Sequence, residues 1–242
     1  MRNPCSAIVV DMSAAAPLQP LLRLGEVAAL ADQARAAVAA VHRRPVSLRR
    51  ADVTGSESVL RGARTSALLD DPTIRLGDEP VGVLGSSISV SSMLAPESLQ
   101  ASARVFSRAP LQILARMAVG AGGTGRPEGS PERLQRLAAL ISSGTAHDVL
   151  LPQVVHAEIL AHELLGERSG LVARAAARLT AVTTGLDPRG LAVPETYLLR
   201  HRAGYLAAAQ AWAAGSAVEF LELSLRSWIA GAEEAEAIAR AL

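Results

Sequence analysis

The polar residues of the stretch HELLGERSGLVAR, residues 162–174, have types and a spacing that could do chemistry. The apolar sequence before them predicts a buried helix that ends at Leu165, and a second helix is predicted to begin at Ser169, with its hydroxyl as the cap. A helix start leaves backbone N–H groups without partners, and these groups and the helix dipole both favour anions. The N–H groups of 169–172 are therefore a candidate anion site, unless the stretch is only a connection between two helices.

Two side chains add to this candidate site. Glu167 precedes the second helix, and carboxylate oxygens suit Mg²⁺. Arg174 lies one turn into that helix, where its guanidinium could contact a phosphate or pair with a carboxylate. His156 is expected to be a core residue. Glu158 and His162, four residues apart, are expected to form a helix-stabilising pair and not a metal site.

The same stretch resembles the motif of the Fic (Fido) family, His-Pro-Phe-x-(Asp/Glu)-Gly-Asn-Gly-Arg-x-x-Arg, which lies across a helix–loop–helix junction. In this alignment Glu163 stands at the position of the catalytic His, and Glu167 stands at that of the metal-binding acid. The phosphate-binding positions of the motif fall on four residues: Ser169, Gly170, Leu171 and Arg174. The flanking sequences VVHAEILAH, VARAAARLTAVTTGLDPRGLAVPE and RAPLQILARM are similar to Fic-like proteins of actinobacteria with an eroded motif, so the resemblance extends over 46–242.

Regulated Fic proteins also carry an inhibitory helix with the pattern (Ser/Thr)-x-x-x-Glu-(Gly/Asn). Its acid pairs with the last Arg of the motif and blocks the γ-phosphate of ATP. The stretch TSALLDD offers Ser66 and Asp70 at a matching place upstream. Because residues four apart share a helical face, both could face the central helix pair. The resemblance therefore predicts a contact between Asp70 and Arg174; the alternative is that Asp70 is an ordinary acid at a helix end.

The activity that the resemblance implies is transfer of AMP from ATP to a protein hydroxyl, with Mg²⁺ as cofactor and the motif His as base. Three changes weigh against it: Glu163 brings negative charge near a polyanion, Leu171 removes a cationic phosphate contact, and Arg168 stands where backbone approach needs Gly. The expected protein is a catalytically impaired relative that binds a nucleotide, another phosphate-containing ligand or a protein partner. Two alternatives stay open: an active nucleotidyl- or phosphoryltransferase with Glu163 as base, and an antitoxin-like interaction protein.

Composition restricts the fold class and the partners. Half of the 242 residues are hydrophobic but only 2% are aromatic, so the core must consist of Ala, Leu and Val, which favours packed helices. All 24 basic residues are Arg, dispersed among 23 acidic residues, and the net charge of +1 disfavours a nucleic-acid partner. No apolar run approaches the roughly 18–20 residues of a membrane span, and the single Cys5 excludes an internal disulfide framework. We expect a cytoplasmic protein without a membrane or nucleic-acid partner.

Hydrophobic periodicity predicts an all-α fold. The resemblance implies a Fic-like helical bundle around the central helix–loop–helix. We expect one compact unit, in which residues 1–45 form an N-terminal segment and the first helix and residues 46–242 form the Fic-like domain. Residues 73–87, TIRLGDEPVGVLGSS, mix β-branched residues with glycines and predict a short β-hairpin or flap. Residues 120–132 predict a surface loop. Helices are expected near 24–44, 56–69, 81–94, 96–107, 111–119, 131–142, 148–165, 169–184, 195–214 and 217–242.

Overall fold

The computed structural model describes residues 17–75, 77–144 and 146–242, so Cys5 lies outside the described residues. Within these ranges every regular element is a helix, which confirms the predicted all-α fold. The α-helices are α1 (Val27–His42), α2 (Pro45–Arg49), α3 (Ala51–Asp70), α4 (Gly82–Ser91), α5 (Pro96–Arg108), α6 (Pro110–Gly120), α7 (Pro131–Ser142), α8 (Leu150–Ala161), α9 (Ser169–Thr184), α10 (Glu195–Arg200), α11 (Arg202–Ala213) and α12 (Val218–Ala241). Two 3-10 helices, η1 (Gln19–Arg23) and η2 (Ser92–Leu94), complete the elements.

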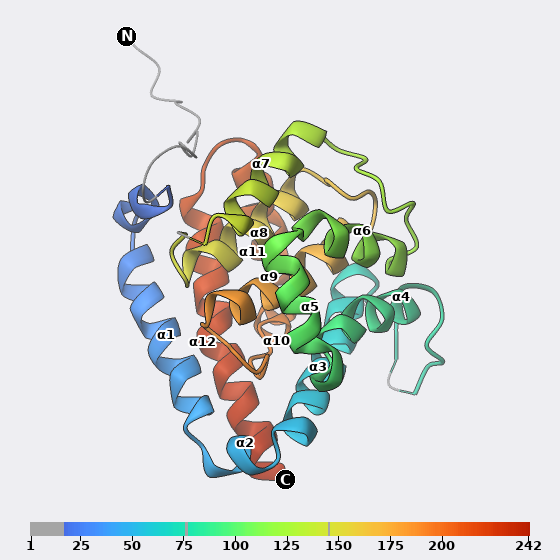
Figure 1. Ribbon diagram of the computed structural model, residues 1–242, viewed down its shortest axis with the longest axis vertical. Helices are drawn as coiled ribbons and strands as arrows, with labels where there is room; N and C mark the ends of the chain where they lie inside the picture. The colour runs from blue at the N-terminus through green and yellow to red at the C-terminus, as the bar shows by residue number, and fades with distance from the viewer. Residues whose placement is uncertain (1–16, 76, 145) are drawn as a thin grey trace.

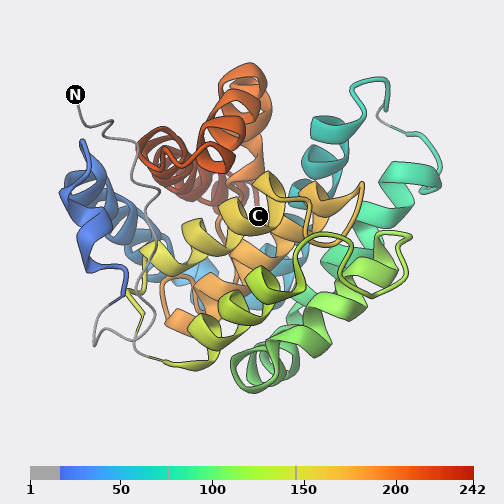
Figure 2. The ribbon, with the colours of Figure 1, turned by 90° about the horizontal axis from the view of Figure 1, so that it is seen from above.

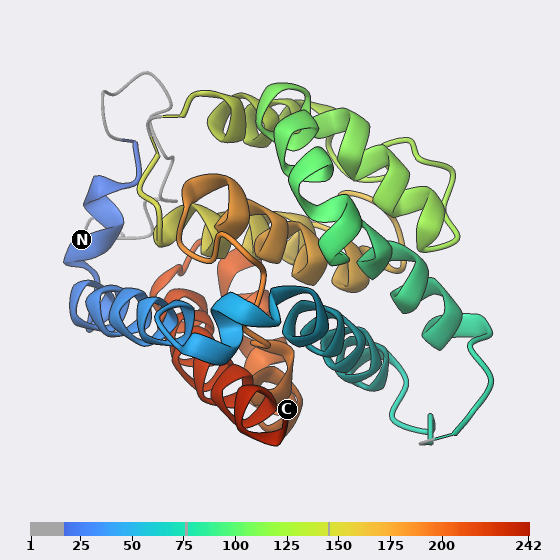
Figure 3. The same cartoon turned by 60° about the horizontal axis from the view of Figure 1, so that its bottom comes forward.

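Helices α8 and α9 pack against each other and lie between two outer layers (Figure 3). Helices α5, α6 and α7 cover one side of the pair, and α3, α11 and α12 contact it from the other. Figure 2 gives the same arrangement from above, with the green helices and the red C-terminal helix on opposite sides of the central pair. Helix α1 runs beside α12 although the two come from opposite ends of the chain (Figure 1). Side chains on α8 and α9 are therefore surrounded by other helices.

Helix α9 is buried along almost its whole length. Every residue from Ser169 to Val182 is buried, including the two arginines Arg174 and Arg178. A helix enclosed in this way needs small or apolar residues on every face, which explains the alanine-rich sequence VARAAARL. The helix ends at Thr184 and is followed by Gly185, whose φ of 81° is the left-handed conformation that favours glycine, and this confirms the predicted stop.

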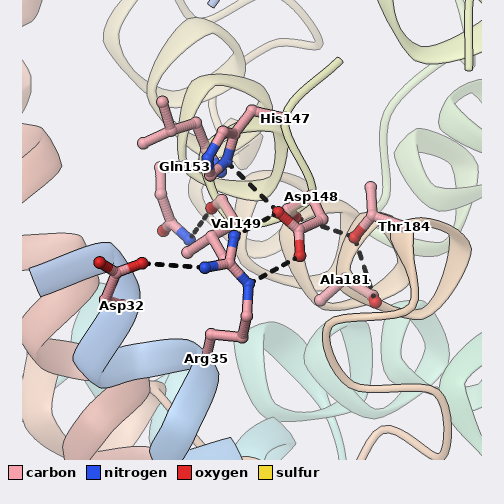
Figure 4. Close-up of polar contacts among 9 residues, drawn as sticks. Asp32, Arg35, His147, Asp148, Val149, Gln153, Ala181 and Thr184 are labelled. Carbon is pink, nitrogen blue, oxygen red and sulfur yellow. Dashed lines mark hydrogen bonds and ion pairs between the residues drawn. The ribbon is translucent and has the colours of Figure 1, made fainter. Parts of the chain in front are cut away.

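The start of α8 is fixed to α1 and to the end of α9 by a polar cluster (Figure 4). Arg35 of α1 donates from Nε and Nη2 to the two carboxylate oxygens of Asp148, at 3.1 and 2.7 Å. The hydrogen bonds from Arg35 lower the pKa of Asp148, so this acid is charged at neutral pH. Thr184, the last residue of α9, donates from its hydroxyl to Asp148 O at 2.9 Å. The cluster fixes the central pair at the end far from the 162–168 turn.

The predicted β-hairpin of residues 73–87 is wrong. The described part of this stretch is a loop as far as Val81, and α4 begins at Gly82. Glycine and proline correctly marked the chain reversal, but the residues after it bury Leu84, Ser87 and Val90, which follow helical spacing and not the alternation of a strand. Apolar spacing therefore decided the structure of this segment, against its β-branched composition.

Helix α8 ends at Ala161, four residues before the predicted end. Leu164 and Leu165 are buried in the turn that follows, so the apolar pattern continues although the helix does not. Glu163 has a φ of 45°, an uncommon conformation for a residue other than glycine, and this reverses the chain direction. Among the described residues, none of the helices combines the length and apolar character that a membrane span requires.

Candidate functional site

The turn between α8 and α9, residues 162–168, is held by its own hydrogen bonds. Gly166 N–H donates to Glu163 O at 3.1 Å, and Ser169 N–H donates to Gly166 O at 2.9 Å. The Ser169 hydroxyl accepts from Leu165 N–H at 3.0 Å, so it stabilises the turn and does not cap α9. The cap position belongs to Arg168, whose side chain makes no capping hydrogen bond. The predicted capping role of Ser169 is therefore wrong.

The first turn of α9 is closed by protein groups. Leu171 is buried, and its N–H donates to Arg168 O at 3.1 Å. Since the Ser169 N–H also has an acceptor, the prediction of free N–H groups is wrong for both residues. A Cβ atom on Gly170 would lie 3.1 Å from Arg174 Nη1 and 3.2 Å from Asp70 Oδ1. The missing side chain of Gly170 thus leaves room for two charged groups beside the start of the helix.

Arg174 is the centre of this arrangement, and α3 supplies most of its partners. Its Nη2 lies 2.7 Å from Asp70 Oδ1, so the predicted contact between Asp70 and Arg174 is present. Arg174 Nε donates to the Ser66 hydroxyl at 2.6 Å, and Nη2 also donates to Ser66 O at 3.0 Å. The Arg174 side chain is 2% exposed, whereas that of Asp70 is 26% exposed. Solvent therefore reaches this ion pair from the Asp70 side.

The opposite side of the Arg174 guanidinium faces a neutral pair on α11 and α8. Nη1 donates to Tyr205 OH at 3.5 Å, and Tyr205 OH lies 2.7 Å from His156 Nε2. Burial, with help from the charge on Arg174, lowers the pKa of His156 to about 3. Burial raises the pKa of Tyr205 to about 12, although Arg174 opposes this shift. Both side chains are consequently uncharged at neutral pH, and Arg174 is the charged member of the group.

The charge on Arg174 is retained despite its burial. Burial alone would lower the pKa of Arg174, but Tyr205 and Asp70 together raise it above its usual value. The positive end of the α9 dipole adds to the field of the guanidinium at the same place. Chemically, the start of α9 is thus a positive site that holds one carboxylate, and it could hold another anion in its place.

The remaining motif positions do not gather at this site. Glu163 and Glu167 are both exposed on the turn. Arg168, at the position of the first motif glycine, donates from Nη1 to the Ser86 hydroxyl at 2.6 Å and to Ala121 O at 3.0 Å. It therefore fastens the turn to α4 and to the end of α6. Within the described ranges, no three His, Cys, Asp or Glu side chains are grouped closely enough to hold a metal ion.

A second buried ion pair was not foreseen from the sequence. Arg178 and Glu195 lie side by side at 3.7 Å from Nη1 to Oε1, and the two side chains are 2% and 5% exposed. Arg178 Nη2 donates to Gly190 O at 3.0 Å. A Cβ atom on Gly62 of α3 would lie 2.2 Å from Arg178 Nη1, so only glycine at this position leaves room for the guanidinium. The available signal was the spacing of Ser58, Gly62 and Ser66, which puts small residues of α3 opposite both arginines.

The sequence also held no specific signal for the hydrogen bond between Tyr205 and His156. The core position expected for His156 is present, since the side chain is 3% exposed. The expected pair of Glu158 with His162 is present, and Glu158 has two further partners. It accepts from Arg133 Nη1 and Trp212 Nε1, each at 2.9 Å, while His162 Nε2 lies 4.0 Å away.

No protein-family model matches the chain, and no curated protein sequence matches it.

Proposed function

We propose that this protein is a catalytically impaired Fic-type protein whose site at the start of α9 binds a phosphate-containing ligand. In this proposal Asp70 is the intramolecular occupant that the ligand displaces. The observation that carries it is the buried Arg174, paired with the partly exposed Asp70 beside Gly170. The proposal rests further on the resemblance of residues 162–174 to the Fic motif, and on the predicted pairing of these two residues from distant helices.

Exchange of Asp70 for a phosphate is physically reasonable because the two anions would satisfy the same groups. Among the described residues, Asp70 is the only carboxylate that pairs with Arg174. Removing it leaves a buried cation without its counter-charge, which is strongly unfavourable. A phosphate oxygen at the same place would restore the charge-assisted hydrogen bond and would also benefit from the helix dipole. In this proposal the buried Arg174 supplies the binding affinity, and the ligand reaches it from the solvent-exposed side of Asp70.

Efficient AMP transfer is not part of this proposal. Glu163, at the position of the base, lies in the turn after α8 and is exposed to solvent. Leu171 is buried and replaces a cationic phosphate contact. Glu167, at the position of the metal-binding acid, is also exposed on the turn and does not join the residues around Arg174. A carboxylate as base and the loss of one cation both lower the stabilisation of a negatively charged transition state.

Titration calorimetry of the unaltered protein, Asp70→Ala and Asp71→Ala tests the proposal. The ligands are orthophosphate and ATP with Mg²⁺. Asp71 is the matched control because it is the neighbouring acid and its carboxylate accepts only from Thr73 among the described residues. Asp70→Ala should bind phosphate at least about tenfold more tightly than the unaltered protein, since a charge-assisted hydrogen bond of about 1.4 kcal/mol no longer competes. Asp71→Ala should bind like the unaltered protein.

Three results would count against the proposal. Folded Asp70→Ala that binds neither ligand at millimolar concentration would make the site a structural ion pair only, as in the interaction-protein alternative. An equal gain in affinity from Asp71→Ala would assign the effect to overall charge. Incorporation of labelled AMP by the unaltered protein would favour the active transferase with Glu163 as base.

A further inference from the structure

Three of the four hydrogen bonds that the Arg174 side chain donates go to groups on α3, and the fourth goes to a group on α11. Ser66 and Asp70 both belong to α3, whereas Tyr205 belongs to α11 and rests on His156 of α8. The Tyr205 ring also packs near Phe220, with ring centroids 6.1 Å apart, and His156 meets the same ring edge-on at 5.2 Å. Tyr205 is thus fixed by groups that do not depend on α3.

The hydrogen bonds that link Arg174, Tyr205 and His156 can be assigned a donor and an acceptor at each step. A guanidinium can only donate, so the Tyr205 oxygen accepts from Arg174 Nη1. The Tyr205 hydroxyl is then free to donate to His156 Nε2, which accepts because His156 is neutral. This requires the histidine tautomer with its proton on Nδ1. Donation from Tyr205 to His156 makes the phenol oxygen a better acceptor for Arg174.

We infer that Tyr205 and His156 are positioning residues that hold Nη1 of Arg174 in place when Asp70 is displaced, so that an incoming phosphate meets an already oriented guanidinium. The inference rests on the proposed function, but the orientation of Arg174 can be measured without any ligand. Both side chains are 3% exposed or less, and a preordered site loses less entropy when it binds. They do not touch the ligand themselves.

The experiment compares Asp70→Ala with Asp70→Ala/Tyr205→Phe by two readouts. The first is nitrogen-15 NMR of the arginine side chains, with the signals of Arg174 assigned by their loss in Arg174→Lys. The second is calorimetric affinity for orthophosphate. Tyr197→Phe is the matched control because it alters the other tyrosine, which stacks on His201 at 4.0 Å and does not contact Arg174.

In Asp70→Ala the two Nη1 protons of Arg174 should give resolved signals, because the hydrogen bond to Tyr205 slows their rotation. In the Tyr205→Phe double variant these signals should merge, and phosphate affinity should fall about threefold to tenfold, the range for one typical intramolecular hydrogen bond. Two further variants are made in the Asp70→Ala background. His156→Gln retains an acceptor for the Tyr205 hydroxyl, so it should keep the resolved signals and the phosphate affinity of Asp70→Ala. His156→Leu should reproduce the effect of Tyr205→Phe. If the Tyr205→Phe variant is unfolded, these two His156 variants still decide whether Tyr205 and His156 hold Nη1 of Arg174 in place.

Resolved Nη1 signals that persist without the Tyr205 hydroxyl would overturn the inference. Equal phosphate affinity in Asp70→Ala and its Tyr205→Phe derivative would also overturn it. If Asp70→Ala binds no phosphate, the proposed function fails, and the NMR comparison alone decides whether Tyr205 and His156 position Arg174.

Discussion

The buried neutral His156 makes the stability of the protein depend on pH in a defined direction. Its pKa falls from the ordinary value of 6.5 to about 3 in the folded state, chiefly because burial disfavours the charged form. Between these two values the unfolded chain binds more protons than the folded chain. The contribution of neutral His156 is therefore fully present above pH 6.5 and is lost as the pH falls toward 3.

The size of this effect follows from the same two values. Each pH unit below 6.5 removes about 1.4 kcal/mol from the free energy of unfolding until the folded state itself takes up the proton. At pH 5 the loss is about 2 kcal/mol, which is a large part of the stability of an ordinary domain. His156→Gln does not titrate and can still accept from Tyr205, so it removes the pH dependence and retains the hydrogen bond.

Urea unfolding of the unaltered protein and His156→Gln, followed by tryptophan fluorescence from pH 7 to pH 4.5, measures the effect. The quantity of interest is the difference in free energy of unfolding between the two proteins at each pH. Other groups with lowered pKa values, such as Asp148, Asp187, His147 and His162, titrate in both proteins and cancel in this difference. The difference should move by about 2 kcal/mol in favour of His156→Gln between pH 6.5 and pH 5. A difference that is constant with pH would refute the reasoning.

Three further outcomes are expected. Glu163→Gly should raise the free energy of unfolding by about 1 kcal/mol, because the φ of 45° suits glycine, and a loss of stability in urea unfolding would contradict this. Gly62→Ala should destabilise the fold by about 2 kcal/mol or more, because the added Cβ atom would clash with Arg178. Gly204→Ala, whose Cβ would lie 3.6 Å from a leucine methyl group, should instead stabilise α11 by about 0.5–1 kcal/mol. Equal effects of the two substitutions on the thermal midpoint would be inconsistent with the packing described. The unaltered protein should incorporate no AMP from labelled ATP into itself, as measured by autoradiography.

Much of the fold could be predicted from the sequence because helical spacing of apolar residues is a strong local signal. The end of α9 was predictable from Gly185, since a left-handed residue there needs glycine. The end of α8 was not, because Leu164 and Leu165 are as apolar as the helix before them and are equally buried in the turn. The chain reverses at Glu163, a residue type that gives no warning of a positive φ.

The candidate site was predictable only in part. The pairing of Asp70 and Arg174 followed from the resemblance to a family pattern, which supplied a contact between helices that local periodicity cannot give. The Tyr205 hydroxyl that completes the surroundings of Arg174 comes from a third helix. Its sequence neighbours are Gly204 and Leu206, with alanines beyond them, and no local pattern shows which of two tyrosines faces a buried arginine. Such side-chain networks depend on how whole helices pack.

The most direct test of the central claim is X-ray diffraction from crystals of Asp70→Ala grown in tungstate, an anion whose metal scatters anomalously and which stands in for phosphate. The claim is that the start of α9 is an anion site occupied by Asp70. The expected result is an anomalous peak within hydrogen-bond distance of Arg174 Nη2, beside Gly170, with the guanidinium in the place it has now. Ordered Arg174 with water or no peak at that position, while tungstate binds elsewhere on the same molecule, would contradict the claim.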